Sequence, residues 1–379
     1  MISWRSYKLK ELCSDIIDCV NKTAPLSPIP TPYKMLRTSD IRNGKINLEN
    51  LNCVSEQTYL LWTRRGKLQK GDVILTREAP LGEVGLVKEP NNYFLGQRLV
   101  LLRADPKKAD NRFLLYALQF HDNKQAIISK GVGSTVLHLR VPECEKIEIY
   151  SPDLPQQKKI ADILSAYDDL IENNQKQIKL LEEAAQRLYK EWFVDLRFPG
   201  WENTKIVDGV PEGWHIGLLS ELISVNYGKD HKKVPNTGDI PVYGSGGIMR
   251  KCNKSLYSGE SVLIPRKGSL NNIMYVNESF WTVDTMFFTI PQKAHSAIFT
   301  YFFVSGIDMY SFNIGAAVPS MTVKILDNLS LIIPDSSFFE KFDMFVQPYF
   351  KKIKFLKMEN DSLIACRNNL LYHLFRSEL

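Results

Sequence analysis

The chain has 379 residues, of which 44% are hydrophobic and 24% charged, and its formal net charge is +6. A chain of this length and composition can bury real cores and divides into two or three domains. The richest apolar run, around residues 298–304, is far shorter than the roughly 20 residues that span a bilayer, and the first residues lack the apolar stretch of a signal peptide. These features exclude a membrane protein and predict a cytoplasmic one.

Neither the cysteines nor the histidines show a metal-binding pattern. The cysteines include no C-x-x-C pair, so we expect them to be buried apolar groups in a reducing compartment. The histidines include no H-x-x-x-H or H-E-x-x-H spacing. We therefore expect no metal site. The residues concerned are Cys13, Cys19, Cys53, Cys144, Cys252, Cys366, His121, His138, His215, His231, His295 and His373.

Residues 1–154 are predicted to form a mixed α/β domain. Short β-rich runs at 72–75 and 99–102 are bounded by Gly, Pro and Asn, and residues 111–120 have a helical pattern. The segment has 23 basic and 17 acidic side chains, so it carries much of the positive charge. Positive charge favours binding to the phosphates of DNA. At the base edges of DNA, arginine can bind guanine, asparagine or glutamine can bind adenine, and glutamate can accept a hydrogen bond from cytosine. The candidates for DNA contacts in this segment are Arg77, Glu78, Gln97, Arg98, His138 and Arg140.

Residues 155–195 are predicted to form one long helix that starts at Pro155. Its apolar residues fall at alternating steps of four and three, as in a heptad seam. At about 1.5 Å per residue the rod is nearly 60 Å long, so it needs a partner helix. The seam consists of Ile160, Leu164, Tyr167, Ile171, Asn174, Ile178, Leu181, Leu188 and Trp192.

Residues 196–336 are predicted to form a second mixed domain. They contain β-rich runs at 261–264 and 329–333 and a helix candidate at 297–304. With 12 basic and 11 acidic side chains up to residue 334, this segment cannot bind DNA by net charge alone, so base-reading groups must matter. The candidates are Tyr243, Ser245, Arg266, Lys267, Asn271, Asn272, Ser320 and Lys324.

Residues 337–379 are predicted to form a second long helix, the natural antiparallel partner of the first. Pro348 predicts a kink or break. Asn360 occupies a polar slot like that of Asn174, and the two asparagines either fix the register of the pair or simply face solvent. The seam residues of this helix are Ile353, Leu356, Asn360, Leu363 and Leu370.

The chain repeats itself. Residues 71–77 match 259–263 with the following Arg266, residues 133–138 match 315–320, and residues 151–153 match 333–335. The last two matches share an offset of 182, which continues into the helices. A period this long is not that of a solenoid. We predict an α/β (mixed α+β) fold with a pseudo-two-fold repeat: two globular domains and two long helices packed as an antiparallel coiled coil.

The loops at 76–82 and 265–272 occupy the same place in the two copies but differ in content. Two modules that recognise different DNA sequences would show this pattern, and so would two diverged surface loops.

Familiar catalytic motifs are absent from the sequence. It contains no phosphate-binding loop, no G-x-S-x-G elbow and no Asn-Pro-Pro-Tyr run. Pro152-Asp153 and Pro334-Asp335 resemble the start of a nuclease metal site, but no acid two places before a lysine follows within 25 residues. We interpret both as strand-to-helix turns with a capping aspartate. The chain is therefore predicted to be non-catalytic.

Four motifs carry a family resemblance. Residues 154–164 (LPQQKKIADIL), 168–174 (DDLIENN) and 180–193 resemble the central conserved region of the specificity (S) subunit of type I restriction-modification systems. Residues 210–214 (VPEGW) resemble that family's entry to its second target-recognition domain. The likeness extends over the whole chain, with target-recognition domains at 1–154 and 196–336 and conserved helices at 155–195 and 337–379.

The resemblance implies a non-catalytic subunit that recognises a bipartite target in double-stranded DNA, one half-site per recognition domain. It also implies two methyltransferase (M) subunits and, in the full complex, restriction (R) subunits as partners. S-adenosylmethionine, ATP and Mg would then be bound by these partners, and no cofactor by this chain. Two other hypotheses remain: an orphan or decoy scaffold subunit, and the recognition subunit of a related system with fused methylation and cleavage.

Overall fold

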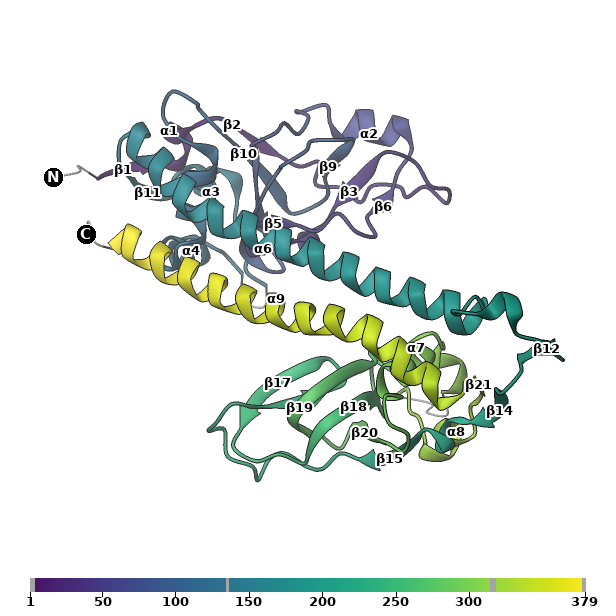
Figure 1. The fold of residues 1–379 in the computed structure, drawn as a ribbon. Helices are drawn as coiled ribbons and strands as arrows, with labels where there is room; N and C mark the ends of the chain where they lie inside the picture. The colour runs from purple at the N-terminus through teal and green to yellow at the C-terminus, as the bar shows by residue number, and fades with distance from the viewer. Residues whose placement is uncertain (1–3, 134–135, 314–317, 377–379) are drawn as a thin grey trace. The chain divides into compact units, whose positions relative to one another are not determined.

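The structure is a computed structural model that describes residues 4–133, 136–313 and 318–376. The chain divides into two compact units, each drawn in Figure 1. Unit 1 comprises residues 1–174 and 359–379, and unit 2 comprises residues 175–358. The division passes through both long helices, so each helix contributes one part to each unit.

Unit 1 is built around an antiparallel sheet with the strand order β2-β10-β7-β8. The central strand β7 is buried along its whole length, which explains its run of apolar residues. Helix α3 begins after Asp110, whose carboxylate accepts the backbone N–H groups of Arg112 and Phe113. The strands are β1 Arg5–Lys8, β2 Cys13–Asp18, β3 Lys34–Leu36, β4 Ile41–Arg42, β5 Lys45–Ile46, β6 Asn52–Cys53, β7 Val73–Arg77, β8 Leu81–Leu86, β9 Tyr93–Leu95, β10 Leu99–Ala104 and β11 Glu148–Ser151.

The short helices of unit 1 are α1 Leu9–Leu12, α2 Glu56–Trp62, α3 Asn111–Gln119, α4 His121–Ser129 and α5 Val141–Glu145. Helix α3 buries six consecutive residues between Phe113 and Leu118 in the core of the unit. The predicted helix at 111–120 and the predicted strands at 72–75 and 99–102 are confirmed.

Unit 2 is built around a six-stranded sheet with the strand order β15-β20-β18-β19-β16-β17. Its strands and short helices confirm the predicted elements at 261–264, 297–304 and 329–333. They are β12 Ile206–Val207, β13 Val210–Pro211, β14 His215–Leu218, β15 Ile223–Tyr227, β16 Ile240–Gly244, β17 Gly247–Cys252, β18 Tyr257–Pro265, β19 Met274–Thr282, β20 Met286–Pro291, β21 Ser330–Ile333, α7 Ala297–Ser305 and α8 Val323–Asp327.

The two units repeat the same strand arrangement, as the sequence predicts. The order β2-β10-β7-β8 in unit 1 corresponds to β15-β20-β18-β19 in unit 2, and the pair β1-β11 corresponds to β14-β21. Backbone hydrogen bonds repeat too: Leu9 N–H donates to Ile147 O, and Leu219 N–H donates to Leu329 O. The match between 133–138 and 315–320 includes residues 134–135 and 315–317, which lie outside the described residues.

The long helices start at equivalent positions, α6 at Leu154 and α9 at Ser336. Before each start an aspartate caps the first turn: Asp153 accepts the N–H of Gln156 at 3.0 Å, and Asp335 accepts the N–H of Ser337 at 2.9 Å. The capping interpretation of both Pro-Asp pairs is therefore confirmed. Helix α6 runs to Tyr189 and ends in a π-helical turn over residues 190–194.

Helix α9 is continuous from Ser336 to Arg376, with Pro348 inside it. The predicted break at Pro348 is therefore wrong. Pro348 is exposed, so water can reach the carbonyl that loses its N–H partner to the proline.

Within each unit the segments of α6 and α9 run in opposite directions. In unit 1 the guanidinium of Arg367 binds the carboxylate of Asp168, and Asn174 lies against Glu359. In unit 2 Tyr189 packs on Phe342, with 6.2 Å between ring centroids. Contacts at which one residue number rises as the other falls define an antiparallel pair.

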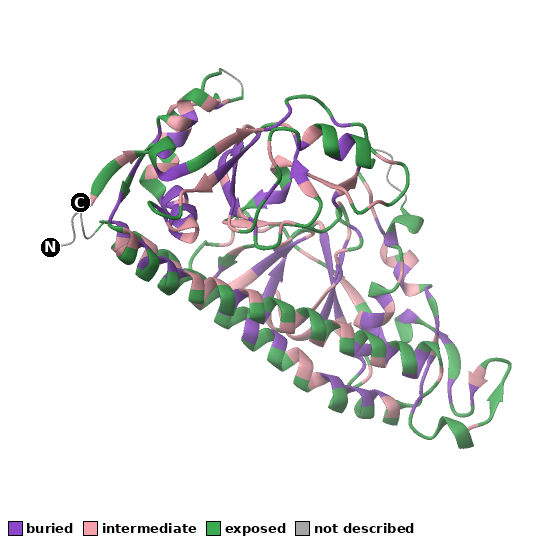
Figure 2. Ribbon diagram, turned by 90° about the horizontal axis from the view of Figure 1, so that it is seen from above, coloured by how far each residue is buried: buried purple, intermediate pink, exposed green. Residues whose placement is uncertain are grey.

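The predicted seam residues of both helices are buried or half-buried. Figure 2 shows buried and intermediate residues alternating with exposed ones along the long helices. Asn174 and Asn360 are only 5% and 7% exposed, so the alternative that they face solvent is wrong. The seam is also continuous with the two globular cores. Ile160 and Leu164 belong to the core of unit 1, and Trp192 to the core of unit 2.

Two further expectations concern the whole chain. Among the described residues no helix has the length and apolar character needed to cross a membrane. Cys366 is exposed and Cys53 half-buried, so the expectation of buried cysteines is wrong for these two residues. Cys366 lies on the exposed face of α9, where burial would require a partner.

Candidate nucleic-acid interface

The end of strand β7 gathers the predicted residues of unit 1. The backbone N–H of Arg77 donates to the carbonyl of Arg98 at 2.8 Å, and the carbonyl of Arg77 accepts the N–H of Leu139 at 2.9 Å. These two bonds bring the segments around residues 77, 98 and 138–140 together, although they lie far apart in the sequence. Arg140 is exposed beside this point.

The side chains at this strand end are paired with one another. Arg77 is 4% exposed and forms an ion pair with Asp18 at 2.8 Å. Glu78 binds Arg98 Nε at 3.2 Å and His138 Nδ1 at 3.2 Å. The surface is thus an alternation of cationic and acidic groups, with Arg98 and His138 holding the carboxylate of Glu78 in place.

Gln97 lies next to Arg98 and is half-buried, and its side-chain oxygen accepts the hydroxyl of Thr23 at 3.4 Å. The structure therefore assembles the predicted residues of unit 1 around one strand end.

The sequence did not single out two residues beside this surface, Asp18 and Arg65. Asp18, at the end of β2, binds Arg77 and also lies 3.7 Å from the guanidinium of Arg65. Arg65 in turn donates to the carbonyl of Cys19 at 2.7 Å. The basic run at 64–70, with four Lys or Arg residues, is the signal that could have found Arg65. No local pattern singles out Asp18.

The end of strand β18 has the same backbone frame in unit 2. The N–H of Arg266 donates to the carbonyl of Thr285 at 2.8 Å, and the carbonyl of Arg266 accepts the N–H of Met321 at 2.9 Å. Here the guanidinium lies over the ring of Tyr227, 5.4 Å from its centroid, and donates to the carbonyl of Asp284 at 3.2 Å.

The loop after Arg266 connects several predicted residues of unit 2. Lys267 is exposed and forms a β-bridge with Ser320. The amide of Asn272 donates to the carbonyl of Ser245 at 2.8 Å. The amide of Asn271 donates to Asp308 at 3.0 Å. These bonds fix a polar loop next to the strand end.

The two remaining predicted residues of unit 2 differ in burial. Tyr243 on β16 is buried, and its hydroxyl donates to Glu278 at 2.7 Å. Burial and this hydrogen bond raise the pKa of Tyr243. Lys324 is exposed on helix α8.

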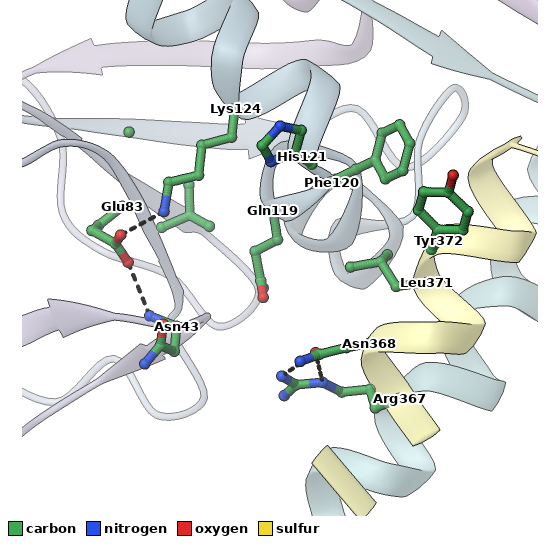
Figure 3. Close-up of a pocket in the computed structure, with 12 residues that line it drawn as sticks. Asn43, Glu83, Gln119, Phe120, His121, Lys124, Arg367, Asn368, Leu371 and Tyr372 are labelled. Atoms are coloured by element: carbon green, nitrogen blue, oxygen red, sulfur yellow. Dashed lines mark hydrogen bonds and ion pairs between the residues drawn. The ribbon is translucent and has the colours of Figure 1, made fainter. Parts of the chain in front are cut away.

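A cavity of about 310 Å³ opens in unit 1 between the corner of helices α3 and α4 and the last turns of α9 (Figure 3). None of the predicted site residues lines it. Glu83 accepts Lys124 Nζ at 2.5 Å and the N–H of Asn43 at 3.0 Å, and Arg367 binds Asn368 and Asp168. Burial raises the pKa of Glu83, but these two bonds outweigh it and lower the pKa overall. Because its charged groups already bind one another, we do not assign a ligand to this cavity.

No cluster of three or more potential metal ligands occurs within residues 4–133, 136–313 and 318–376.

Comparison with known families identifies the family of this chain. The family model described as the type I restriction modification DNA specificity domain matches residues 1–183 and 211–363, most of the chain. The chain belongs to this family of type I specificity proteins. The two matched ranges correspond to the two copies of the repeat.

Curated relatives of this type I specificity protein agree. The specificity subunit of the type I restriction enzyme MjaIX from Methanocaldococcus jannaschii is 27% identical over 341 residues, which cover 82% of this chain and 78% of the relative. The MjaVIII specificity subunit of the same organism is 30% identical over 202 residues, 53% of this chain and 44% of the relative. The HindI specificity subunit from Haemophilus influenzae is 25% identical over 52% of this chain and 42% of its own length.

A solved structure supports the fold. The crystal structure of the type I restriction-modification S subunit from M. genitalium aligns with a TM-score of 0.65 and 20% identity over 99% of this chain and 96% of that one. The duplicated architecture of this type I specificity protein is therefore that of a known S subunit.

Proposed function

We propose that this chain is the DNA-recognition subunit of a type I restriction-modification complex and that each copy of the repeat reads one half of a bipartite target in double-stranded DNA. The observation that carries the proposal is the duplicated strand end. Arg77 and Arg266 sit in the same backbone frame, yet the side chains around them differ. A conserved frame with different polar groups is what two recognition modules for different sequences need.

The proposed DNA contacts in unit 1 come from Glu78, Gln97, Arg98, His138 and Arg140, with Arg77 beneath them. Those in unit 2 come from Arg266, Lys267, Asn271, Asn272, Ser245 and Ser320, with Tyr243 and Lys324 at the margin. Phosphate contacts would position each unit, and these polar groups would read base edges.

The long helices are the proposed binding site for partner subunits. Beyond the seam, α6 exposes Ile163, Leu170 and Leu180, and α9 exposes Met344 and Phe355, the last two by 70% and 55%. Large apolar side chains in this number on helix surfaces are typical of protein interfaces. We propose that two methyltransferase subunits dock here, bringing S-adenosylmethionine, and that restriction subunits add ATP- and Mg-dependent cleavage. This chain would carry no catalytic group or cofactor and would act in the cytoplasm.

The test is to co-express the chain with the methyltransferase subunit of its restriction-modification system and to map methylated bases across the host genome. We expect a motif of two defined half-sites separated by a gap of fixed length. A matched control with the methyltransferase subunit alone should leave no such motif.

Other outcomes would contradict the proposal. A stable complex without any methylated motif would favour an orphan or decoy subunit. Cleavage by a co-purifying protein with both activities would favour a system in which methylation and cleavage are fused. Metal-dependent cleavage by the purified chain alone would overturn the non-catalytic role.

A further inference from the structure

The strand pairing identifies which residue faces the strand-end arginine in each copy. In unit 1 Val100 on β10 pairs with Asp18 on one side and with Leu75 on the other. In unit 2 the corresponding Phe287 on β20 pairs with Tyr227 and with Ile264. Asp18 and Tyr227 therefore occupy the same position, the last residue of the first strand of the sheet.

This one position has opposite chemistry in the two copies. In unit 1 the carboxylate of Asp18 binds the guanidinium of Arg77, which is 4% exposed. A buried arginine that is neutralised in this way cannot reach a base edge without breaking an ion pair in a partly desolvated site. Arg77 instead ties β2 to β7 and to the carbonyl of Leu139. It is an internal anchor.

In unit 2 the ring of Tyr227 is 54% exposed and supports the guanidinium of Arg266 from one face. A tyrosine ring does not neutralise an arginine. It holds the planar group in a fixed orientation and leaves its N–H donors available apart from the one that binds the carbonyl of Asp284. Arg266 is therefore held in one orientation and has no ion pair among the described residues.

The residue that follows the strand-end arginine also differs between the two copies. Glu78 follows Arg77 and binds Arg98 and His138, whereas Lys267 follows Arg266 and is exposed. At the strand end of unit 1 the adjacent residues Arg77 and Glu78 have opposite charges, whereas in unit 2 the adjacent Arg266 and Lys267 are both cations. These two cations are adjacent although residues 196–334 have a net charge of only +1.

We propose that the residue at the end of the first strand, Asp18 in unit 1 and Tyr227 in unit 2, determines whether the strand-end arginine takes part in DNA recognition. Arg266 is then a specificity-determining residue of unit 2 that reads guanine, the base matched to a planar guanidinium. Tyr227 is its positioning residue. This inference rests on the proposed DNA-recognition function.

The decisive variant is Tyr227→Asp, which places the residue of unit 1 in unit 2. The matched control is Tyr227→Phe, which keeps the ring, and Arg266→Met removes the guanidinium directly. Each variant of the chain is co-expressed with the methyltransferase subunit, and methylated bases are mapped. Tyr227 lies on the edge strand β15, more than half exposed, so the fold should tolerate both changes at this position.

We expect Tyr227→Asp and Arg266→Met to relax the same single guanine position, with preference over the other bases falling by about 5- to 150-fold. The half-site read by unit 1 should be unchanged in every variant, and Tyr227→Phe should keep the complete motif. A structural role alone would reduce methylation at all sites without relaxing one base.

Three results would overturn the inference: a full motif in Tyr227→Asp, relaxation in Tyr227→Phe equal to that in Tyr227→Asp, or different bases relaxed by Tyr227→Asp and Arg266→Met. If Tyr227→Asp fails to assemble, Arg266→Met alone decides, since it must relax one guanine. Absence of any bipartite motif with the unmodified chain is a separate result that contradicts the proposed function itself.

Discussion

Asn174 on α6 donates a side-chain N–H to a carboxylate oxygen of Glu359 on α9, 2.8 Å away. The next residue of α9, Asn360, is also buried, and its Oδ1 has no hydrogen-bond partner among the described residues. With the offset of 182, the repeat equivalents of Asn174 and Asn360 are Leu356 and Ile178, both apolar. The polar residues thus occur at this level of the helix pair in unit 1 only, which is a way to distinguish one register from another.

Replacing Asn360 by leucine should therefore stabilise the protein. The change removes a buried oxygen without a partner, so we expect the free energy of unfolding to rise by about 1 kcal/mol. Chemical denaturation measures it. Asn369→Leu, at an exposed position of the same helix, is the control and should leave stability unchanged. A loss of stability in Asn360→Leu would show that the asparagine is satisfied in solution.

Tyr116 anchors the last part of α9 on unit 1 through Asp168. Its hydroxyl donates to that carboxylate at 2.6 Å, and Arg367 binds the same carboxylate from α9. Tyr116→Phe removes one hydrogen bond to a charged group and should lower the free energy of unfolding by about 1.5–3 kcal/mol. Tyr150→Phe, at an exposed tyrosine of β11, is the matched control for loss of a hydroxyl. Equal effects of the two changes in urea unfolding would contradict this role of Asp168.

Local sequence patterns predict some features of this structure and miss its long-range contacts. The β-rich runs, the heptad spacing, the capping aspartates and the offset of 182 are local or repetitive signals. They therefore predicted the strands, the long helices with their starts, and the duplication. The ion pair of Asp18 with Arg77 joins residues 59 positions apart, and nothing near either one announces it. The hydrogen bond from the hydroxyl of Tyr243 to Glu278 joins residues 35 positions apart, and no local pattern predicts it. The break predicted at Pro348 does not occur, because the rule for proline inside a helix takes no account of exposure to water.

His295 should make the stability of unit 2 depend on pH. Its Nδ1 lies 3.0 Å from the carboxylate of Asp343, and this hydrogen bond raises the pKa of His295. A raised pKa means that the folded state binds the proton more tightly. The stabilisation is therefore fully present below the ordinary histidine pKa of about 6.5 and disappears as pH rises through the higher value of the folded state.

The expected size of this effect is about 0.5 kcal/mol, because the imidazole is half exposed. Thermal unfolding at pH 5.5 and 8.5 should show His295→Gln less stable than the unmodified chain at pH 5.5 and equal to it at pH 8.5. The control is His373→Gln, at an exposed histidine of α9. This variant should be as stable as the unmodified chain at both pH values. If His295→Gln lost more stability at pH 8.5 than at pH 5.5, the pH dependence would be opposite to the expected one. That result would contradict a raised pKa of His295 in the folded state.

The two capping aspartates offer a comparison between the copies. Asp153→Ala and Asp335→Ala each remove the acceptor of the first turn of a long helix, so each should cost about 1 kcal/mol of stability. Asparagine at either position should restore most of the loss, because its side-chain oxygen can accept the same N–H. Unfolding of the four single variants measures this, and alanine variants as stable as the unmodified chain would contradict the capping role.

The length of the helix pair should set the gap between the half-sites. Seven residues, one heptad, add about 10 Å of helix and preserve the seam, and base pairs are spaced by about 3.4 Å. Inserting a heptad after Asn174 in α6 and another after Met358 in α9 should therefore lengthen the non-specific gap by about three base pairs, with both half-sites unchanged. Insertion in α6 alone is the control: it shifts one seam against the other and should abolish methylation. Methylation mapping gives the gap directly, and an unchanged gap in the double insertion would show that something other than the helices spaces the two recognition surfaces.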